Sequence, residues 1–139
     1  MKKIKILATT LMTSFMLMSS SIQANAVDTN PPFVKARATA YCLSGKTASG
    51  QTVRKGICAG KKEWFGKTIY IYKRLPDDSV GELIGIYECL DAGGTKAIKT
   101  GKVIDVWCED YSSCQDFMNL VYEDDCKGKI YIQVFDAVG

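Results

Sequence analysis

Short runs of alternating apolar and polar residues, separated by glycines, are the feature that most constrains the fold of this chain. Successive side chains of a β-strand face opposite sides, so such alternation predicts strands with one buried face. The runs are rich in β-branched and aromatic residues and cover 67–74, 82–90, 102–108 and 129–135. A further β-rich pattern begins at Phe33. A mainly β fold built from short strands is therefore predicted.

One helix interrupts the predicted strands. Ser112 and Gln115 are spaced as a capping box with Ser112 as the N-cap, and apolar residues follow at helical spacing at Phe117, Leu120 and Val121. The helix is expected to end before 124–128, and the segment 75–79 is expected to be a hairpin turn. Several short strands with one or two short helices favour a small, closed β-barrel.

The beginning of the chain has the pattern of a secretory signal peptide over residues 1–26. It combines three lysines, an apolar stretch at Ile6–Met18 and a small-residue cleavage site at Ala24–Ala26. This stretch is too short to span a bilayer, which takes about 20 residues. We expect residues 27–33 to be a flexible lead-in and 34–139 to be one folded domain. The product is expected to be a secreted, extracytoplasmic monomer of the cell envelope, with no membrane contact after leader cleavage.

The charge of the chain argues against a nucleic-acid partner. The formal net charge is +3, and Lys2, Lys3 and Lys5 of the predicted leader account for all of it. The rest of the chain carries as many acidic as basic residues, so it has no excess positive charge for binding phosphates. We therefore expect no nucleic-acid partner.

The cysteines and the missing histidine limit the chemistry. All 6 cysteines follow the predicted leader, and an even number in a small exported chain predicts a disulfide-stapled fold whose connectivity stays open. The chain has no histidine, which excludes Ser-His-Asp and Cys-His catalysis. No CxxC pair is present on which a four-cysteine zinc site could be built. We expect no metal and no cofactor, so any chemistry must use carboxylates, hydroxyls, lysines or backbone groups.

Asp105 and Asp91 are the candidate catalytic residues. Asp105 lies inside the otherwise apolar strand 103–107, where partial burial would raise the pKa of its carboxyl and suit it to act as a general acid. Asp91 ends a strand and opens a loop that continues with Gly93 and Gly94, a suitable place for a carboxylate that faces a substrate. Structural roles remain open for both, because Asp105 could bind backbone amides or a lysine and Asp91 could be a turn residue.

Other polar and aromatic residues have two open interpretations as well. The segment Thr47–Gly50, which includes Ser49, is either a substrate-contacting loop or a polar turn. Trp107 is either a platform for stacking a sugar or a packing residue of the barrel rim.

Six short motifs are spread along the chain. The early ones are Ala38–Tyr41, Thr47–Gly50 and Gly66–Ile71. The late ones are an Asp-x-Gly-Gly loop at 91–94, an Ile-Lys-x-Gly step at 98–101 and an Ile-Asp strand at 103–107. Together they resemble the three-aspartate (3D) domain family over the chain from about Val34 to Val138. This resemblance implies a six-stranded double-psi β-barrel, an extracytoplasmic location and peptidoglycan or a related glycan as the partner.

The enzymes of this family include membrane-bound lytic transglycosylase A and the stationary-phase muralytic proteins. They cleave the MurNAc–GlcNAc bond without water and form a 1,6-anhydro product. Carried over by motif, Asp105 is the acid and base and Asp91 is its neighbour, which orients the substrate and raises the pKa of Asp105 by its charge. The candidate substrate-contacting residues are Thr47, Ser49, Gly93, Gly94, Lys99 and Trp107.

The chain departs from the family pattern at one of the three aspartates. The family's first aspartate lies in the strand before Gly66–Ile71, and this region reads Ile57–Gly60 here, with Gly60 or a neighbour in its place. The spacer between the other two aspartates is longer, with Thr95-Lys96 as the insertion. The sequence therefore predicts a secreted lytic transglycosylase, with a non-catalytic, expansin-like glycan-binding module as the alternative and a secreted inhibitor or effector as a third class.

Overall fold

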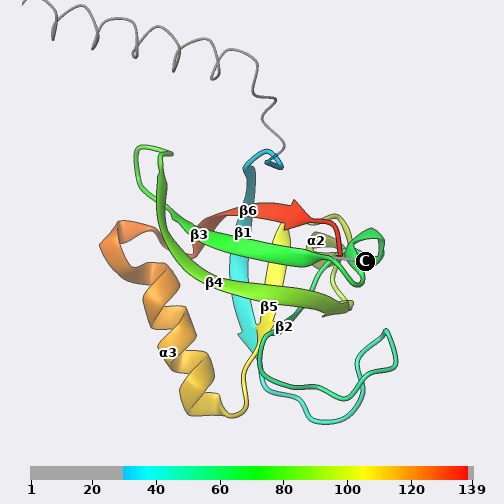
Figure 1. Cartoon of the computed structure of the whole chain (residues 1–139). Coiled ribbons are helices and arrows are strands. Elements are labelled where there is room, and N and C mark those ends of the chain that lie inside the picture. The colour runs from blue at the N-terminus through cyan, green and yellow to red at the C-terminus, as the bar shows by residue number, and fades with distance from the viewer. Residues whose placement is uncertain (1–29, 138–139) are drawn as a thin grey trace, which may run out of the picture. The chain divides into compact units, whose positions relative to one another are not determined.

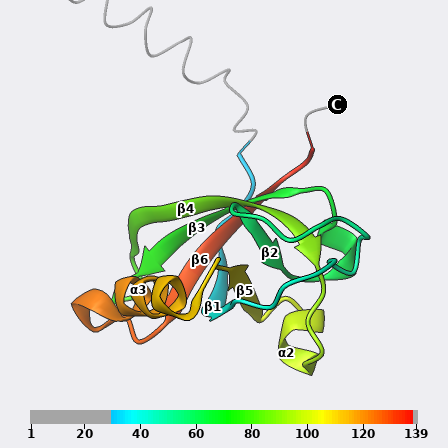
Figure 2. The same cartoon turned by 90° about the horizontal axis from the view of Figure 1, so that it is seen from below.

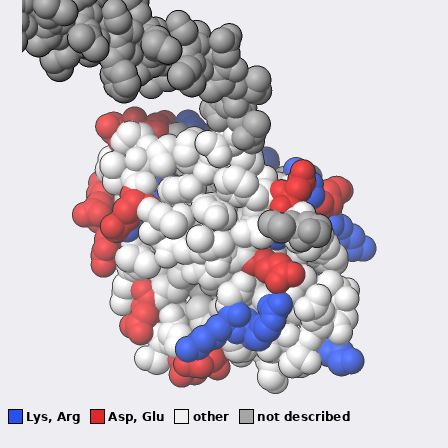
Figure 3. All heavy atoms as spheres, viewed as in Figure 1, with Lys and Arg blue, Asp and Glu red and all other residues white. Residues whose placement is uncertain are grey.

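The structure is a computed structural model that describes residues 30–137, and we refer to these as the described residues. The predicted leader lies outside them, as do residues 27–29 of the predicted lead-in. No helix among them is long and apolar enough to cross a membrane. Basic and acidic side chains are interspersed on the face seen in Figure 1, around a broad uncharged area (Figure 3).

Six strands form a closed β-barrel, which confirms the predicted mainly β fold (Figure 1). They are β1 (Val34–Tyr41), β2 (Ile57–Ala59), β3 (Thr68–Arg74), β4 (Val80–Asp91), β5 (Val103–Trp107) and β6 (Lys129–Phe135). Around the barrel their order is β1-β5-β2-β4-β3-β6. The pairs β1–β5 and β2–β4 are parallel, and the other four pairs are antiparallel. The predicted turn 75–79 joins β3 to β4.

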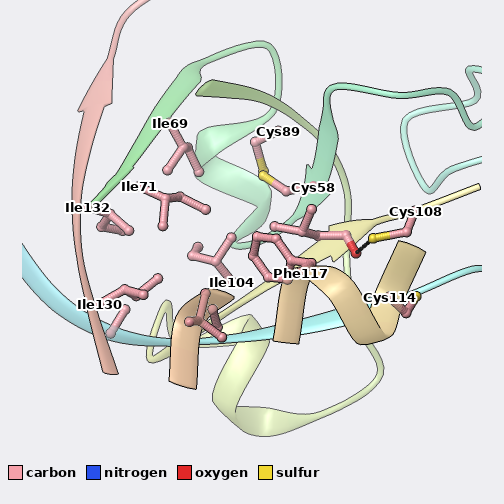
Figure 4. Packing of buried hydrophobic residues seen from close by; sticks show 14 residues of the cluster. Cys58, Ile69, Ile71, Cys89, Ile104, Cys108, Cys114, Phe117, Ile130 and Ile132 are labelled. Carbon is pink, nitrogen blue, oxygen red and sulfur yellow. Dashed lines mark hydrogen bonds between the residues drawn. The ribbon is translucent and has the colours of Figure 1, made fainter. Parts of the chain in front are cut away.

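Isoleucines from three strands, β3, β5 and β6, fill the barrel. The alternation that predicts the strands sends one set of side chains inward, where Ile69, Ile71, Ile104, Ile130 and Ile132 are fully buried (Figure 4). Burying an isoleucine side chain stabilises a fold by roughly 1.5–3 kcal/mol, so this cluster is a main source of stability. On β5 the inward residues Ile104 and Val106 leave Asp105 on the outer face.

The main helix, α3 (Tyr111–Tyr122), lies beside the barrel and packs on β1 and β6 (Figure 2). Its buried face includes Phe117 and Val121. The predicted N-cap was wrong, because Asp110 caps the helix and accepts a 2.7 Å hydrogen bond from the backbone N–H of Ser113. A carboxylate is a strong cap because it also complements the positive end of the helix dipole. The helix ends before 124–128, as predicted, and the 3-10 helix η2 (Glu123–Asp125) follows.

Two further short helices lie at positions that were not predicted. The helix α2 (Lys96–Lys99) is capped by Thr95, whose hydroxyl accepts a hydrogen bond from Ile98 N–H. The 3-10 helix η1 (Lys62–Trp64) follows β2. Seen from below, α2 and α3 lie at opposite sides of the barrel (Figure 2).

The predicted disulfide staple is absent, since all six cysteines are free thiols in the structure. The fold does not divide them into three pairs. Cys58 and Cys89 are register partners on β2 and β4, and their thiols lie side by side (Figure 4). Cys42, Cys108 and Cys114 gather near the ends of β1 and β5, and burial raises the pKa of the Cys114 thiol to about 12. Cys126 lies instead beside Lys73 and Asp124, so an even count does not translate into three bridges.

Candidate functional site

The strand register brings the two predicted catalytic aspartates together. Ala59 on β2 is the register partner of Asp105 on one side and of Asp91 on the other. Thr39 on β1 is the register partner of Asp105 in turn. Side chains in register on paired strands share a face of the sheet, so these four residues form a row across four neighbouring strands.

A β-bulge places Asp91 in this row. Cys58 pairs with Cys89, but the next residue of β2, Ala59, pairs with Asp91 rather than with Leu90. The extra residue in β4 shifts the alternation of side chains at the end of that strand. Without it, Leu90 would stand beside Ala59, and the carboxylate of Asp91 would face the other side of the sheet.

Asp105 is half-buried and only partly bound. The Thr39 hydroxyl donates a 2.8 Å hydrogen bond to Oδ1 of Asp105, and no other donor among the described residues reaches this carboxylate. Burial raises the pKa of Asp105, the charge of Asp91 raises it further, and the hydrogen bond from Thr39 opposes the rise. Asp105 is therefore neither saturated by backbone amides nor paired with a lysine.

Asp91 is held in place by three donors. The backbone N–H groups of Ala48 and Ala92 donate to Oδ1 at 2.7 Å and 2.9 Å. The Tyr41 hydroxyl donates to Oδ2 at 2.9 Å. Burial raises the pKa of Tyr41 above its usual range, as do Asp91 and Asp105, so Tyr41 remains a proton donor. The Asp91 carboxylate thus ties β4 to β1 and to the loop that contains Ala48.

The two carboxylates open onto one pocket of about 250 Å³. Its walls come from the ends of β1, β2, β4 and β5, the glycine loop after β4, and α2. The lining residues are Tyr41, Leu43, Ala59, Asp91, Ala92, Gly93, Gly94, Thr95, Ile98 and Asp105. We call it the acid pocket. Neither aspartate forms an ion pair with any described lysine or arginine, so the two negative charges lack a protein cation.

The glycine loop is shaped by its packing on α2. A Cβ added at Gly93 would lie 2.9 Å from the Cβ of Ile98, which is too close for any side chain. A Cβ at Gly94 would meet nothing within 4 Å. Gly93 is therefore required for the loop to pack on Ile98, while Gly94 borders open space.

The other predicted substrate-contacting residues lie outside the lining of the acid pocket. Thr47 is buried and its hydroxyl is 2.9 Å from that of Ser49, so both build the loop that binds Asp91. The Trp107 indole N–H donates a 2.8 Å hydrogen bond to the carbonyl of Leu43 and supports the pocket rim. Lys99 lines a second cavity next to the acid pocket.

Sequence reasoning missed Thr39, Tyr41 and Leu43. Thr39 and Tyr41 alternate on β1 and so share a face, which is the signal by which their pairing with carboxylates could have been found. Leu43 lies beyond the strand, is 72% exposed and lines the acid pocket. An exposed leucine of this kind has no signal in the sequence.

The arrangement can hold a proton and present it to a ligand in the pocket. Asp105 has a raised pKa and an oxygen without a protein donor, while Asp91 is fixed by three hydrogen bonds and supplies a neighbouring negative charge. A carboxyl with a raised pKa is suited to general acid catalysis near neutral pH. No group of three or more cysteine, aspartate or glutamate side chains in the described range is arranged to hold a metal ion.

In comparisons with known proteins, no family model and no curated protein matches this chain.

Proposed function

We propose that this chain is a secreted peptidoglycan lytic transglycosylase of the 3D-domain type, acting in the cell envelope. Its barrel would be a double-psi β-barrel, and the closed six-strand sheet with two parallel pairs supports this. The observation that carries the proposal is that Asp91 and Asp105 open onto one pocket without a protein cation. The resemblance of the 91–94, 98–101 and 103–107 motifs to the 3D domain supplies the substrate class.

In this mechanism Asp105 acts twice. Its carboxyl donates a proton to the glycosidic oxygen between MurNAc and GlcNAc as the bond from MurNAc C1 to that oxygen breaks. The resulting carboxylate accepts the proton of the MurNAc C6 hydroxyl, whose oxygen attacks C1. The products are a 1,6-anhydro-MurNAc end and a free GlcNAc hydroxyl, and no water is consumed. One carboxyl suffices because the acid of the first half becomes the base of the second.

Asp91 serves as the neighbour that prepares Asp105. Its charge contributes to the raised pKa of Asp105, and its three hydrogen bonds fix the loops around the pocket. Ala59 lines the acid pocket between the two aspartates, whereas Gly60 lines the adjacent cavity. Ala59 is therefore the residue that would stand where the family has its first aspartate.

The test is digestion of purified peptidoglycan in H₂¹⁸O, followed by mass spectrometry of the soluble fragments. The 1,6-anhydro ends should form without ¹⁸O, and Asp105→Asn should lower their yield at least about 100-fold. Thermal unfolding of the variant checks that it remains folded. Reducing ends that contain ¹⁸O would mean hydrolysis, and fragments formed equally by Asp105→Asn would remove Asp105 from the chemistry.

A second candidate is a glycan-binding module that cleaves nothing. The observation that favours it is the alanine at position 59, which leaves two carboxylates where the family has three. Sedimentation with insoluble peptidoglycan in the absence of any released fragment would support this alternative and would exclude the transglycosylase.

A further inference from the structure

The cavity next to the acid pocket has the opposite charge. It is about 290 Å³ and is lined by Gly60, Lys62, Glu63, Ala92 and Lys99. We call it the lysine pocket. It shares Ala92 with the acid pocket, and Gly60 directly follows Ala59 of that pocket. A polymer bound across the two aspartates therefore has the lysine pocket as a neighbouring position.

The two lysines have no protein partner. The side chains of Lys62 and Lys99 are exposed, and neither takes part in an ion pair or a hydrogen bond among the described residues. Lys61 next to them differs, because its ammonium lies 4.9 Å from the ring centroid of Trp64 in a cation–π contact. With Glu63 also unpaired, the lysine pocket holds two ammonium groups against one carboxylate.

We infer that the lysine pocket is a subsite for a carboxylate carried by the muramyl units of the glycan. This inference rests on the proposed function, since it takes the wall glycan as the polymer in the acid pocket. Along such a strand, alternate sugars carry a lactyl group that ends either in a free carboxylate or in a peptide with carboxylates of its own. Lysine ammonium groups recognise such groups as point charges on flexible stems, which suits a substituent of variable length. The same backbone without carboxylates, as in chitin, would gain nothing from this subsite.

A second lysine pair offers a matched control. Lys96 and Lys102 line a separate cavity with Ala97 and Thr100, and that cavity shares no lining residue with the acid pocket. Lys96 and Lys99 belong to the same short helix, α2. A double substitution at Lys96 and Lys102 therefore removes the same charge from the same region without touching the lysine pocket.

The experiment measures binding rather than cleavage, by calorimetry in the Asp105→Asn background. Three probes share one glycan backbone: a GlcNAc–MurNAc tetrasaccharide with free lactyl carboxylates, the same tetrasaccharide with peptide stems, and neutral chitotetraose. Lys62→Gln with Lys99→Gln should weaken binding of at least one carboxylate probe about five- to tenfold and leave chitotetraose unchanged. Lys96→Gln with Lys102→Gln should change all three by less than about twofold. Glu63→Gln should tighten the same carboxylate probe about twofold, because it removes a like charge.

The carboxylate probe that responds identifies the source of the group, either the lactyl carboxylate or the stem peptide. The inference is overturned if the Lys62 and Lys99 substitutions affect neither carboxylate probe, if they weaken chitotetraose equally, or if no probe binds. These outcomes are separate from those of the proposed cleavage. If anhydro ends form but binding does not depend on Lys62 and Lys99, the proposed function stands and the subsite is excluded. If binding depends on these lysines but nothing is cleaved, the subsite stands and the transglycosylase is excluded.

Discussion

Two groups of carboxylates lie at opposite ends of β4, and they differ in the groups that surround their negative charges. At the Asp91 end, two carboxylates face a pocket and receive hydrogen bonds from neutral donors only. At the Val80 end, the ammonium of Lys73 lies 2.9 Å from Glu82, 2.9 Å from Glu123 and 3.2 Å from Asp124. The side chain of Lys73 is only 2% exposed. The first arrangement leaves its carboxylates without a cation, whereas the second gathers its carboxylates around one buried ammonium group.

The difference distinguishes carboxylates that stabilise this fold from carboxylates that can take part in catalysis. The Lys73 ammonium donates hydrogen bonds to Glu82 and Glu123, and these raise the pKa of Lys73 despite its burial. The lysine therefore remains charged and joins η2 to the β3–β4 hairpin. Burial and a like charge raise the pKa of Asp105, so that group can hold a proton. We therefore assign a stabilising role to the carboxylates around Lys73 and a catalytic role to the carboxyl of Asp105.

The largest effect on stability is expected from Lys73→Met. The change leaves three carboxylates together without their cation, and we expect the free energy of unfolding to fall by about 2–3 kcal/mol in urea titrations. The exposed pair of Lys35 and Asp78 provides the control, since Lys35→Met should cost less than about 0.5 kcal/mol. Equal effects of the two substitutions would remove the distinction between the buried cluster and a surface ion pair.

Gly93→Ala tests the packing of the acid pocket. Its new Cβ would collide with Ile98, and such overpacking should cost about 2 kcal/mol of stability and displace the glycine loop. Gly94→Ala is the matched control and should stay within about 0.5 kcal/mol, because its Cβ meets open space. Urea unfolding measures both, and a Gly93→Ala protein as stable as Gly94→Ala would show that Ile98 does not fix this loop.

Tyr41→Phe tests the neutral donors of the acid pocket. Removing the hydroxyl deletes the 2.9 Å hydrogen bond to Asp91, with an expected loss of about 1 kcal/mol in unfolding free energy. Tyr72→Phe is the control, because it removes a 2.8 Å hydrogen bond to the uncharged side chain of Gln133. A hydrogen bond to a charged acceptor is the stronger kind, so Tyr41→Phe should cost more than Tyr72→Phe. The opposite order would mean that Asp91 does not depend on this donor.

The smallest effect on stability is expected from Asp105→Asn, and its sign depends on pH. Because the pKa of Asp105 is raised on folding, its stabilising contribution is complete below the unfolded value of 3.8 and is lost as the pH rises through the folded value. The asparagine does not titrate, so the stability of the variant relative to the wild-type chain should increase across that pH range. Thermal unfolding at several pH values measures it, and a variant that loses relative stability as the pH rises would contradict the raised pKa.

Much of the barrel can be predicted from the sequence, because strand alternation is local. The four alternating runs correspond to β3, β4, β5 and β6, and the helix around Phe117 lies where its spacing predicts. The strand β2 is only three residues long, too short for alternation to be read from the sequence. The cap at Asp110 was missed because both Asp110 and Ser112 are residues that cap helices well. The backbone conformation before the helix decides between them, and it is extended at Asp110.

The candidate site is less predictable, because it depends on register. Asp91 and Asp105 stand out in the sequence by their positions, but a single bulge in β4 decides whether Asp91 faces the same side as Asp105. No local pattern marks that bulge. The donors Thr39 and Tyr41 lie more than fifty positions before Asp105, and only the parallel pairing of β1 with β5 brings them to the carboxylates. For the same reason the count of six cysteines could not reveal their grouping.

The most direct test is the titration of the Asp105 carboxyl by ¹³C NMR in the wild-type chain, in Asp91→Asn and in Lys73→Met. We predict a pKa above 3.8 in the wild-type chain, a lower value in Asp91→Asn, and an unchanged value in Lys73→Met. That result would establish Asp105 as a carboxyl prepared by burial and by Asp91. A pKa at or below 3.8, or a pKa that is the same in Asp91→Asn as in the wild-type chain, would contradict the role of Asp105 as the acid.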